Sequence, residues 1–132
     1  GFSPFAPEVA AMKAGRLMLQ EIRSLASAGS NFAFETTLSG RGYVRLLRDW
    51  RSDGYEIKLF FLLLAKPEEA IARVTQRVAQ GGHHVPDEVV CRRFHAGLQN
   101  FKEIYRYEVD FWHLYDNSSE ELTLIDEGAR NE

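Results

Sequence analysis

The run Glu35-Thr36-Thr37-Leu38-Ser39-Gly40-Arg41-Gly42 joins a carboxylate, hydroxyls and glycines directly after a short apolar segment. That segment, residues 31–35 (NFAFE), is apolar enough to be a buried strand, where a carboxylate is costly without a partner. At the carboxyl end of a parallel strand, Glu35 would instead point into a ligand crevice and accept hydrogen bonds from substrate hydroxyls or hold Mg²⁺ through water. Thr37 and Ser39 add hydroxyls on the same rim. The structural alternative is a polar strand end, with Ser39 as the cap of the next helix.

Four arginines flank a loop that contains glycines and histidines. The loop is residues 81–85 (GGHHV), and the arginines are Arg73, Arg77, Arg92 and Arg93. Arg73 and Arg77 lie four residues apart and therefore share one helix face. Guanidinium groups on both sides of such a loop could form a lid over a phosphate, because phosphoryl transfer spreads negative charge over the transferred oxygens. The alternative is an ordinary exposed helix face on which Glu68 or Glu69 pairs with Arg73.

The adjacent His83 and His84 raise the question of a metal site. No cysteine or carboxylate cluster lies at ligand spacing nearby, and adjacent residues seldom chelate one ion well. We therefore expect no metal site here and interpret the pair as loop histidines that could contact phosphate.

The elements that position these residues alternate between helix and strand. Four helices are predicted: residues 8–28, the segment from Ser39 to Asp53-Gly54, residues 67–80, and a long helix from Pro86 whose apolar face ends at Tyr105. Four strands are predicted, over residues 31–35, 55–64, 112–115 and 122–125. The strand 55–64 (YEIKLFFLLL) becomes continuously apolar, as expected of a parallel strand covered on both faces. This alternation predicts a three-layer α/β fold with a mostly parallel sheet, in which ligands bind beyond the carboxyl ends of the strands.

Composition limits the class of protein. The 132 residues carry a net charge of −3, with 45% hydrophobic and 27% charged residues, as in an ordinary globular domain. The acidic balance argues against general nucleic-acid binding and against binding to anionic membranes. No apolar run approaches the roughly 18 residues that cross a bilayer. The single cysteine, Cys91, excludes an internal disulfide and fits a reducing cytoplasm, so a cytoplasmic protein is expected.

Taken together, these segments resemble the zeta-toxin group of P-loop kinases. The matching pieces are FAFETTLSGRGY, DGYEIKLFFLLLAKPEEAIARVTQRV, GGHHVP, RRF and LYDNS, which span roughly residues 3–118. The resemblance implies a nucleotide kinase-like P-loop fold, with residues 1–118 as the C-terminal portion of the kinase domain, a lid at about 73–93, and residues 119–132 as a final short strand and acidic tail. The best-known members phosphorylate UDP-N-acetylglucosamine, so ATP and Mg²⁺ are the implied cofactors and a sugar-nucleotide-like molecule the implied substrate.

The resemblance also implies which residues bind the substrate. Glu35 and Thr37 match motif positions that line the sugar-nucleotide site. Arg16 matches a helix arginine near the substrate, although a carboxylate that the family carries on that helix is Leu19 here.

Other matches concern the nucleotide. Arg77 matches the lid arginine on the ATP phosphates, while the family's next lid arginine is replaced by His83. Either His83 or one of Arg92 and Arg93 would then take that role. Asp116-Asn117-Ser118 falls in the loop where P-loop kinases commonly hold the adenine.

The chain departs from the family at its front. It contains no G-x-x-x-x-G-K-[ST] run, whose amides, lysine and hydroxyl make the nucleotide site, and it opens on Gly1 rather than Met. We therefore expect an upstream portion to have been removed, together with the first strand and the P-loop. The chain alone is then expected to be inactive, with an open strand position that invites self-association.

The sequence thus predicts an ATP-dependent phosphotransferase of zeta-toxin type in the intact protein. Arg77, helped by Arg92 or Arg93, would contact the phosphates, and Glu35 and Thr37 would position the acceptor. The alternative is a non-catalytic remnant or interaction module that binds a partner such as an antitoxin-like protein.

Overall fold

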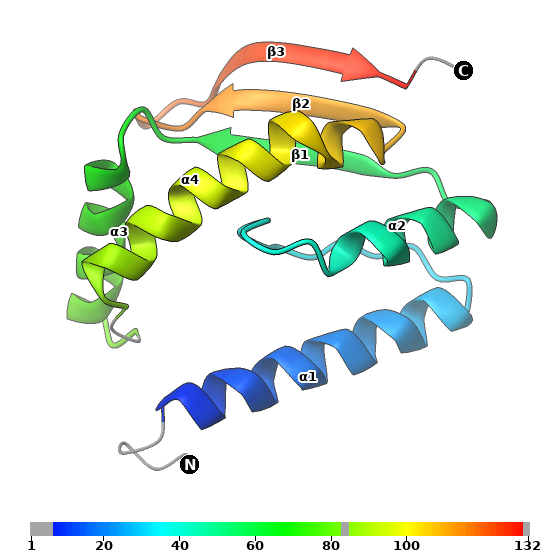
Figure 1. The fold of residues 1–132 in the computed structure, drawn as a ribbon, viewed down its shortest axis with the longest axis horizontal. Helices are drawn as coiled ribbons and strands as arrows, with labels where there is room; N and C mark the ends of the chain where they lie inside the picture. Colours follow the sequence, from blue (N-terminus) through cyan, green and yellow to red (C-terminus); the bar gives the residue numbers. More distant parts are fainter. Residues whose placement is uncertain (1–6, 83–84, 131–132) are drawn as a thin grey trace. The chain divides into compact units, whose positions relative to one another are not determined.

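A computed structural model describes residues 7–82 and 85–130 of the chain (Figure 1). Its elements are α1 (Pro7–Ser27), α2 (Tyr43–Ser52), β1 (Lys58–Leu63), α3 (Pro67–Ala79), α4 (Asp87–Glu103), the 3-10 turn η1 (Tyr105–Tyr107), β2 (Phe111–Asp116) and β3 (Thr123–Ala129). The chain divides into two compact units, residues 1–36 and residues 37–132, which are described separately below. No helix in the described ranges is both long enough and apolar enough to span a bilayer.

The described part of the first unit consists of α1 and the segment that follows it. The helix is rich in Ala, Leu, Met, Lys, Arg and Glu, which are strong helix formers. It ends where expected, with Gly29 and Ser30 donating backbone hydrogen bonds to the carbonyls of Ala26 and Leu25.

The strand predicted over residues 31–35 does not form. Burial still alternates there, and the rings of Phe32 and Phe34 stack with centroids 6.4 Å apart, as side chains on one side of an extended chain do. However, the segment pairs with none of the described strands. Extended backbone becomes a strand only when a neighbour accepts and donates its ladder hydrogen bonds, so the apolar pattern alone was insufficient.

The second unit is built on a three-stranded sheet in the order β1-β2-β3. β1 and β2 are parallel, with Lys58 opposite Phe111 and Leu63 opposite Asp116, whereas β3 runs antiparallel to β2. The prediction of a mostly parallel sheet therefore fails at β3. The reason is the short connection, residues 117–122, because a parallel crossover needs a dozen or more residues and a shorter link makes a hairpin.

Helix α4 packs across one face of this sheet (Figure 1). The ring of Phe101 lies 4.7 Å from that of Phe61 on β1 and 5.7 Å from that of Trp112 on β2, measured between centroids. Trp112 in turn faces Gly128 on β3, where a Cβ would lie 2.6 Å from the indole ring, so only glycine leaves room for it. Phe101, Tyr105 and Val109 are almost completely buried and form the centre of the core.

The β1 residues on the opposite face of the sheet are exposed, contrary to the expectation of a strand covered on both faces. Phe60 and Leu62 of β1 are 55% and 49% exposed, and burial alternates along the strand. Phe60 stacks on His113 of β2 at 5.0 Å between centroids. Because α4 packs on the face that carries Phe61, only alternate residues of the continuously apolar strand are covered.

Ser39 does not cap α2. The N-cap residue is Gly42, which makes no side-chain capping hydrogen bond, and the Ser39 hydroxyl lies 2.8 Å from Thr37 Oγ1 instead. The other helix boundaries agree with the sequence to within a few residues.

Candidate functional site

The parallel strands β1 and β2 end side by side, which brings the 116–118 loop (Asp116, Asn117 and Ser118) to the end of β1. The amide of Asn117 donates to the carbonyl of Leu63 at 2.8 Å. The amide of Ala65 donates to Ser118 Oγ at 3.2 Å, and the amide of Ser118 donates to Asp116 Oδ1 at 2.8 Å. The loop expected to hold adenine is therefore fixed at the carboxyl edge of the sheet, where ligands bind in α/β folds.

Helix α3 fastens this loop from the other side. Glu69 accepts hydrogen bonds from the Ser118 hydroxyl at 3.0 Å and from the amide of Ala65 at 3.2 Å. Arg73 donates from Nη2 to the carbonyl of Asn117. Arg73 thus binds the protein backbone. It does not pair with Glu69, which was the alternative interpretation of the sequence; Arg73 and Glu69 instead contact the loop separately, at Asn117 and Ser118.

The remaining lid arginines lie on either side of the loop that joins α3 to α4. Arg77 is in the last turn of α3, and its carbonyl accepts from the amide of Gly82 at 2.7 Å. Arg92 and Arg93 lie near the start of α4, and all three side chains are exposed. His83, between them, lies outside the described residues. The exposed guanidinium groups are available to an anion in solution.

Residues 37–40 (TLSG, the 37–40 segment) dock against α4. A Cβ on Gly97 would lie 2.4 Å from the carbonyl oxygen of Thr37, so the close approach of the two backbones requires glycine at position 97. Leu38 is 5% exposed and has φ of 56°, a left-handed conformation that costs a leucine energy. Such strain persists only where the surroundings hold it, and it is common at functional sites.

Two side chains hold the backbone of this segment. Asn100, which is buried, donates from Nδ2 to the carbonyl of Leu38 at 2.8 Å, and the Tyr105 hydroxyl donates to the carbonyl of Gly40 at 2.6 Å. Burial raises the pKa of the Tyr105 hydroxyl above its ordinary value, so it remains a donor at neutral pH. These bonds hold the backbone on both sides of Ser39, and the Thr37 side chain is exposed.

Arg93 shares the face of α4 that receives the 37–40 segment. It lies four residues before Gly97 and seven before Asn100, and these spacings fall on one helix face. Arg92 is five residues before Gly97 and points toward a different face. The helix therefore distinguishes two arginines that the sequence treated as equivalent.

Two predicted substrate residues belong to the first unit. Arg16 lies on α1 and Glu35 follows the apolar pair Phe32 and Phe34, and both side chains are exposed. Thr37, at the start of the second unit, is two residues further along the chain from Glu35.

Several residues of the site were not predicted from the sequence. Glu69, Gly97, Asn100 and Tyr105 hold the 116–118 loop or the 37–40 segment. Asn100 carried a signal that could have been used, because it adjoins Phe101 on the apolar stripe of α4, and a buried amide requires a partner.

One of the comparisons with known proteins identifies a family. The family model of zeta toxin matches residues 4–128. The chain is 26% identical over 92 residues to an uncharacterized protein of Haemophilus influenzae, a match that covers 70% of this chain and 66% of that protein, just under two thirds of its length. No solved structure matches. Since the family match covers nearly the whole chain, the protein belongs to the zeta toxin family.

Proposed function

We propose that the intact protein is an ATP-dependent phosphotransferase that acts on a small, sugar-nucleotide-like acceptor such as UDP-N-acetylglucosamine. Membership of the zeta toxin family supports a nucleotide-binding, kinase-like activity. The residue assignment rests on one observation. The face of α4 that holds the 37–40 segment through Gly97 and Asn100 also carries Arg93.

The roles follow from the chemistry of these side chains. Arg77 and Arg93 would donate to phosphate oxygens, because a planar guanidinium group binds two oxygens at once and keeps its charge at every relevant pH. The Thr37 hydroxyl would donate to or accept from hydroxyl groups of the acceptor, and the Glu35 carboxylate would accept from them. Asn117 and Ser118 would lie beside the nucleoside, with Arg73 and Glu69 acting as positioning residues for that loop.

ATP would supply the phosphoryl group, and the exposed guanidinium groups fit its charge. Mg²⁺ is different: the described residues include no group of three or more His, Cys, Asp or Glu side chains that could hold a metal ion. We therefore assign the metal no ligand in this part of the molecule and derive no step through it.

The assignment is tested by Arg93→Gln and Arg92→Gln in the protein as expressed from its native gene. We expect Arg93→Gln to lower kcat at least tenfold, while Arg92→Gln changes it less than threefold, since loss of one charge-assisted contact costs about a factor of ten or more. The assay is ATP turnover with UDP-N-acetylglucosamine at saturating concentrations. Equal effects of the two substitutions on kcat would contradict the assignment of Arg93, rather than Arg92, to the site.

Arg77 and Glu35 require different readouts. Arg77→Ala is expected to lower turnover far more than acceptor affinity, because its contacts are with the transferred phosphate. Glu35→Gln is expected mainly to raise the acceptor KM. Unchanged turnover in the first variant, or unchanged acceptor affinity in the second, would refute the respective role.

A second candidate is a non-catalytic interaction module, such as the partner of an antitoxin-like protein. It is favoured by the exposed Phe60 and Leu62 on β1, which offer an apolar surface to a partner. Titration with ATP and size-exclusion chromatography separate the two candidates. Measurable affinity for ATP supports the kinase, whereas a stable protein–protein complex without affinity for ATP supports the interaction module.

A further inference from the structure

A second group of arginines lies near the amino-terminal end of β2, which is the end opposite the 116–118 loop. Because β3 is antiparallel to β2, its last residues return to this end, and Ala129 pairs with Phe111. A cavity of about 480 Å³ opens there, lined by Arg48, Arg51, Ser52, Tyr107, Glu108 and Arg130. We call it the arginine cavity.

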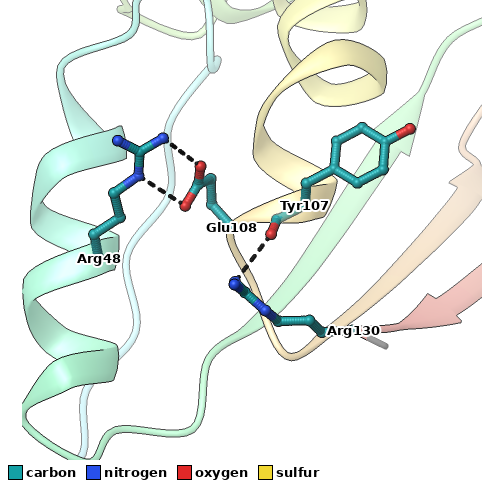
Figure 2. Close-up of polar contacts among 4 residues, drawn as sticks. All are labelled: Arg48, Tyr107, Glu108 and Arg130. Carbon is teal, nitrogen blue, oxygen red and sulfur yellow. Dashed lines mark hydrogen bonds and ion pairs between the residues drawn. The ribbon is translucent and has the colours of Figure 1, made fainter. Parts of the chain in front are cut away.

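Three segments contribute its charges, as Figure 2 shows for Arg48, Glu108 and Arg130. Arg48 and Arg51 are three residues apart on α2 and share a face. Glu108 follows η1, and Arg130 follows β3. Residues far apart in the sequence thus bring three guanidinium groups to one cavity.

The carboxylates at this end neutralise only two of the three cations. Arg48 donates hydrogen bonds to both carboxylate oxygens of Glu108, from Nε at 3.1 Å and from Nη2 at 2.7 Å. Arg51 Nε lies 3.5 Å from Asp110 Oδ1, while the other oxygen of Asp110 accepts from the amide of Ile57 at 2.7 Å. Asp110 is therefore shared between a side chain and the backbone.

Arg130 has a neutral partner. Its Nη1 donates to the carbonyl of Tyr107 at 3.1 Å, and among the described residues no carboxylate forms an ion pair with it. Arg51 Nε is shielded from solvent and has no hydrogen-bond acceptor within that part of the chain. Within the described part of the chain, three guanidinium groups therefore face two carboxylates, of which Glu108 also attracts Arg130. Arg51 Nε, although 3.5 Å from Asp110 Oδ1, makes no hydrogen bond there.

We propose that the arginine cavity binds a phosphate group, with Arg130 and Arg51 as its ligands and Glu108 as an internal anion that holds Arg48 at the rim. A tetrahedral anion accepts hydrogen bonds from several directions, which suits donors that come from α2 and from the end of β3. The cavity is larger than one phosphate ion, so the phosphate can be free or part of a phosphomonoester. This site is separate from the lid arginines and does not depend on the proposed kinase activity.

Backbone NMR of the ¹⁵N-labelled chain tests the proposal by titration with sodium phosphate at constant ionic strength. We expect saturable shifts at the amides of Ser52, Glu108 and Arg130, and these shifts should persist in Arg77→Ala, which alters the lid. Arg130→Gln should raise the phosphate Kd about tenfold. Arg45→Gln, an exposed arginine of α2 outside the cavity, is the matched control and should leave the Kd unchanged.

A parallel titration with ribose 5-phosphate distinguishes the two forms of the ligand. Tighter binding than that of inorganic phosphate assigns the cavity to a phosphomonoester, and equal or weaker binding assigns it to the free ion. The absence of saturable shifts with either probe, or equal behaviour of Arg130→Gln and Arg45→Gln, would overturn the proposal.

Glu108→Gln gives an independent measurement. Removal of the internal anion leaves Arg48 without its carboxylate, so added phosphate should raise the Tm of Glu108→Gln by more than it raises that of the unmodified chain. Equal shifts in the two proteins would mean that the arginines serve only to attach α2. If Glu108→Gln does not fold, the comparison of Arg130→Gln with Arg45→Gln still decides.

Discussion

The two ends of the sheet use charged side chains in different ways. At the amino-terminal end of β2, Arg48 and Arg51 bind the carboxylates of Glu108 and Asp110. At the carboxyl end, Arg73 binds a backbone carbonyl, Glu69 binds a hydroxyl and an amide, and the other lid arginines are exposed. One end is tied together chiefly by ion pairs, and the other by hydrogen bonds between side chains and loop backbone.

The two kinds of contact have different structural effects. Ion pairs between side chains connect α2 to the sheet without fixing the course of a loop. Hydrogen bonds to backbone carbonyls of Asn117, Leu38 and Gly40 instead define loop conformation, which is what a binding site requires. The substitutions below test this distinction.

Gly97→Ala should have the largest effect. The added methyl group would lie 2.4 Å from the carbonyl oxygen of Thr37, and a backbone atom cannot move aside cheaply, so we expect a loss of about 2 kcal/mol in the free energy of unfolding. Urea denaturation measures it. Gly15→Ala, a helical glycine with nothing within 4 Å of its Cβ position, is the control and should gain up to about 1 kcal/mol. A stabilised Gly97→Ala protein would show that the 37–40 segment is not docked on α4.

Tyr105→Phe should cost about 1 kcal/mol, because the carbonyl of Gly40 loses its donor. The pKa of Tyr105 is raised in the folded protein, so the contribution of the hydroxyl is complete below the unfolded pKa of about 10 and is lost as pH rises through the folded value. The difference between the two proteins in urea should therefore shrink above about pH 10. Tyr107 is 57% exposed, and its hydroxyl accepts only an exposed hydrogen bond from Arg106, so Tyr107→Phe should change stability little at any pH. A difference that grew with pH would contradict the burial argument.

Arg73→Gln should act locally. Without its contact to the carbonyl of Asn117, the 116–118 loop should open more often, and hydrogen exchange of the Asn117 amide should accelerate by up to about tenfold. Arg77→Gln, on the same helix face but exposed, should leave that exchange rate unchanged. Unaltered exchange in Arg73→Gln would mean that the bond from Asn117 to Leu63 is enough to hold the loop.

The pair of Arg48 and Glu108 should have the smallest effect, since its arginine is largely exposed and solvent screens the attraction. Hydrogen bonds from Arg48 lower the pKa of Glu108 below its ordinary value of 4.5. The stabilisation is therefore present above pH 4.5 and disappears as pH falls through the folded value. Urea midpoints of the unmodified chain and Arg48→Gln should differ slightly at pH 7 and coincide in acid. A difference that persisted at low pH would assign the effect of Arg48 to packing rather than charge.

The elements that were predicted correctly are those that depend on the local sequence pattern. The helices, β1 and β2 followed from apolar spacing and from end signals such as Gly29 and Pro67. Residues 31–35 had the right pattern but do not pair with any of the strands that the structure describes, a condition that composition does not reveal. The direction of β3 could have been predicted, because six residues cannot form a parallel crossover.

The sequence proposed candidate site residues but not their supports. Thr37, Asp116 and Arg77 stay predictions from residue type and position, and the groups that hold the 37–40 segment and the 116–118 loop were not predicted. Gly97 and Asn100 lie sixty residues from the segment that they contact, and only the packing of α4 shows why one must lack a side chain and the other must be an amide. The ion pairs of Arg48 and Arg51 could not be predicted either, because their partners Glu108 and Asp110 are about as distant in the sequence.

The left-handed backbone of Leu38 has a consequence for tracing this protein's relatives. Glycine would relax the backbone there, yet it would leave the space of a side chain that is 5% exposed unfilled, so the two demands oppose each other. A homologue that retains a bulky apolar residue at this position between two hydroxyl residues has kept the bend itself. The apolar residue, rather than the hydroxyls beside it, is therefore the more informative marker of a 37–40 segment that is docked in the same way.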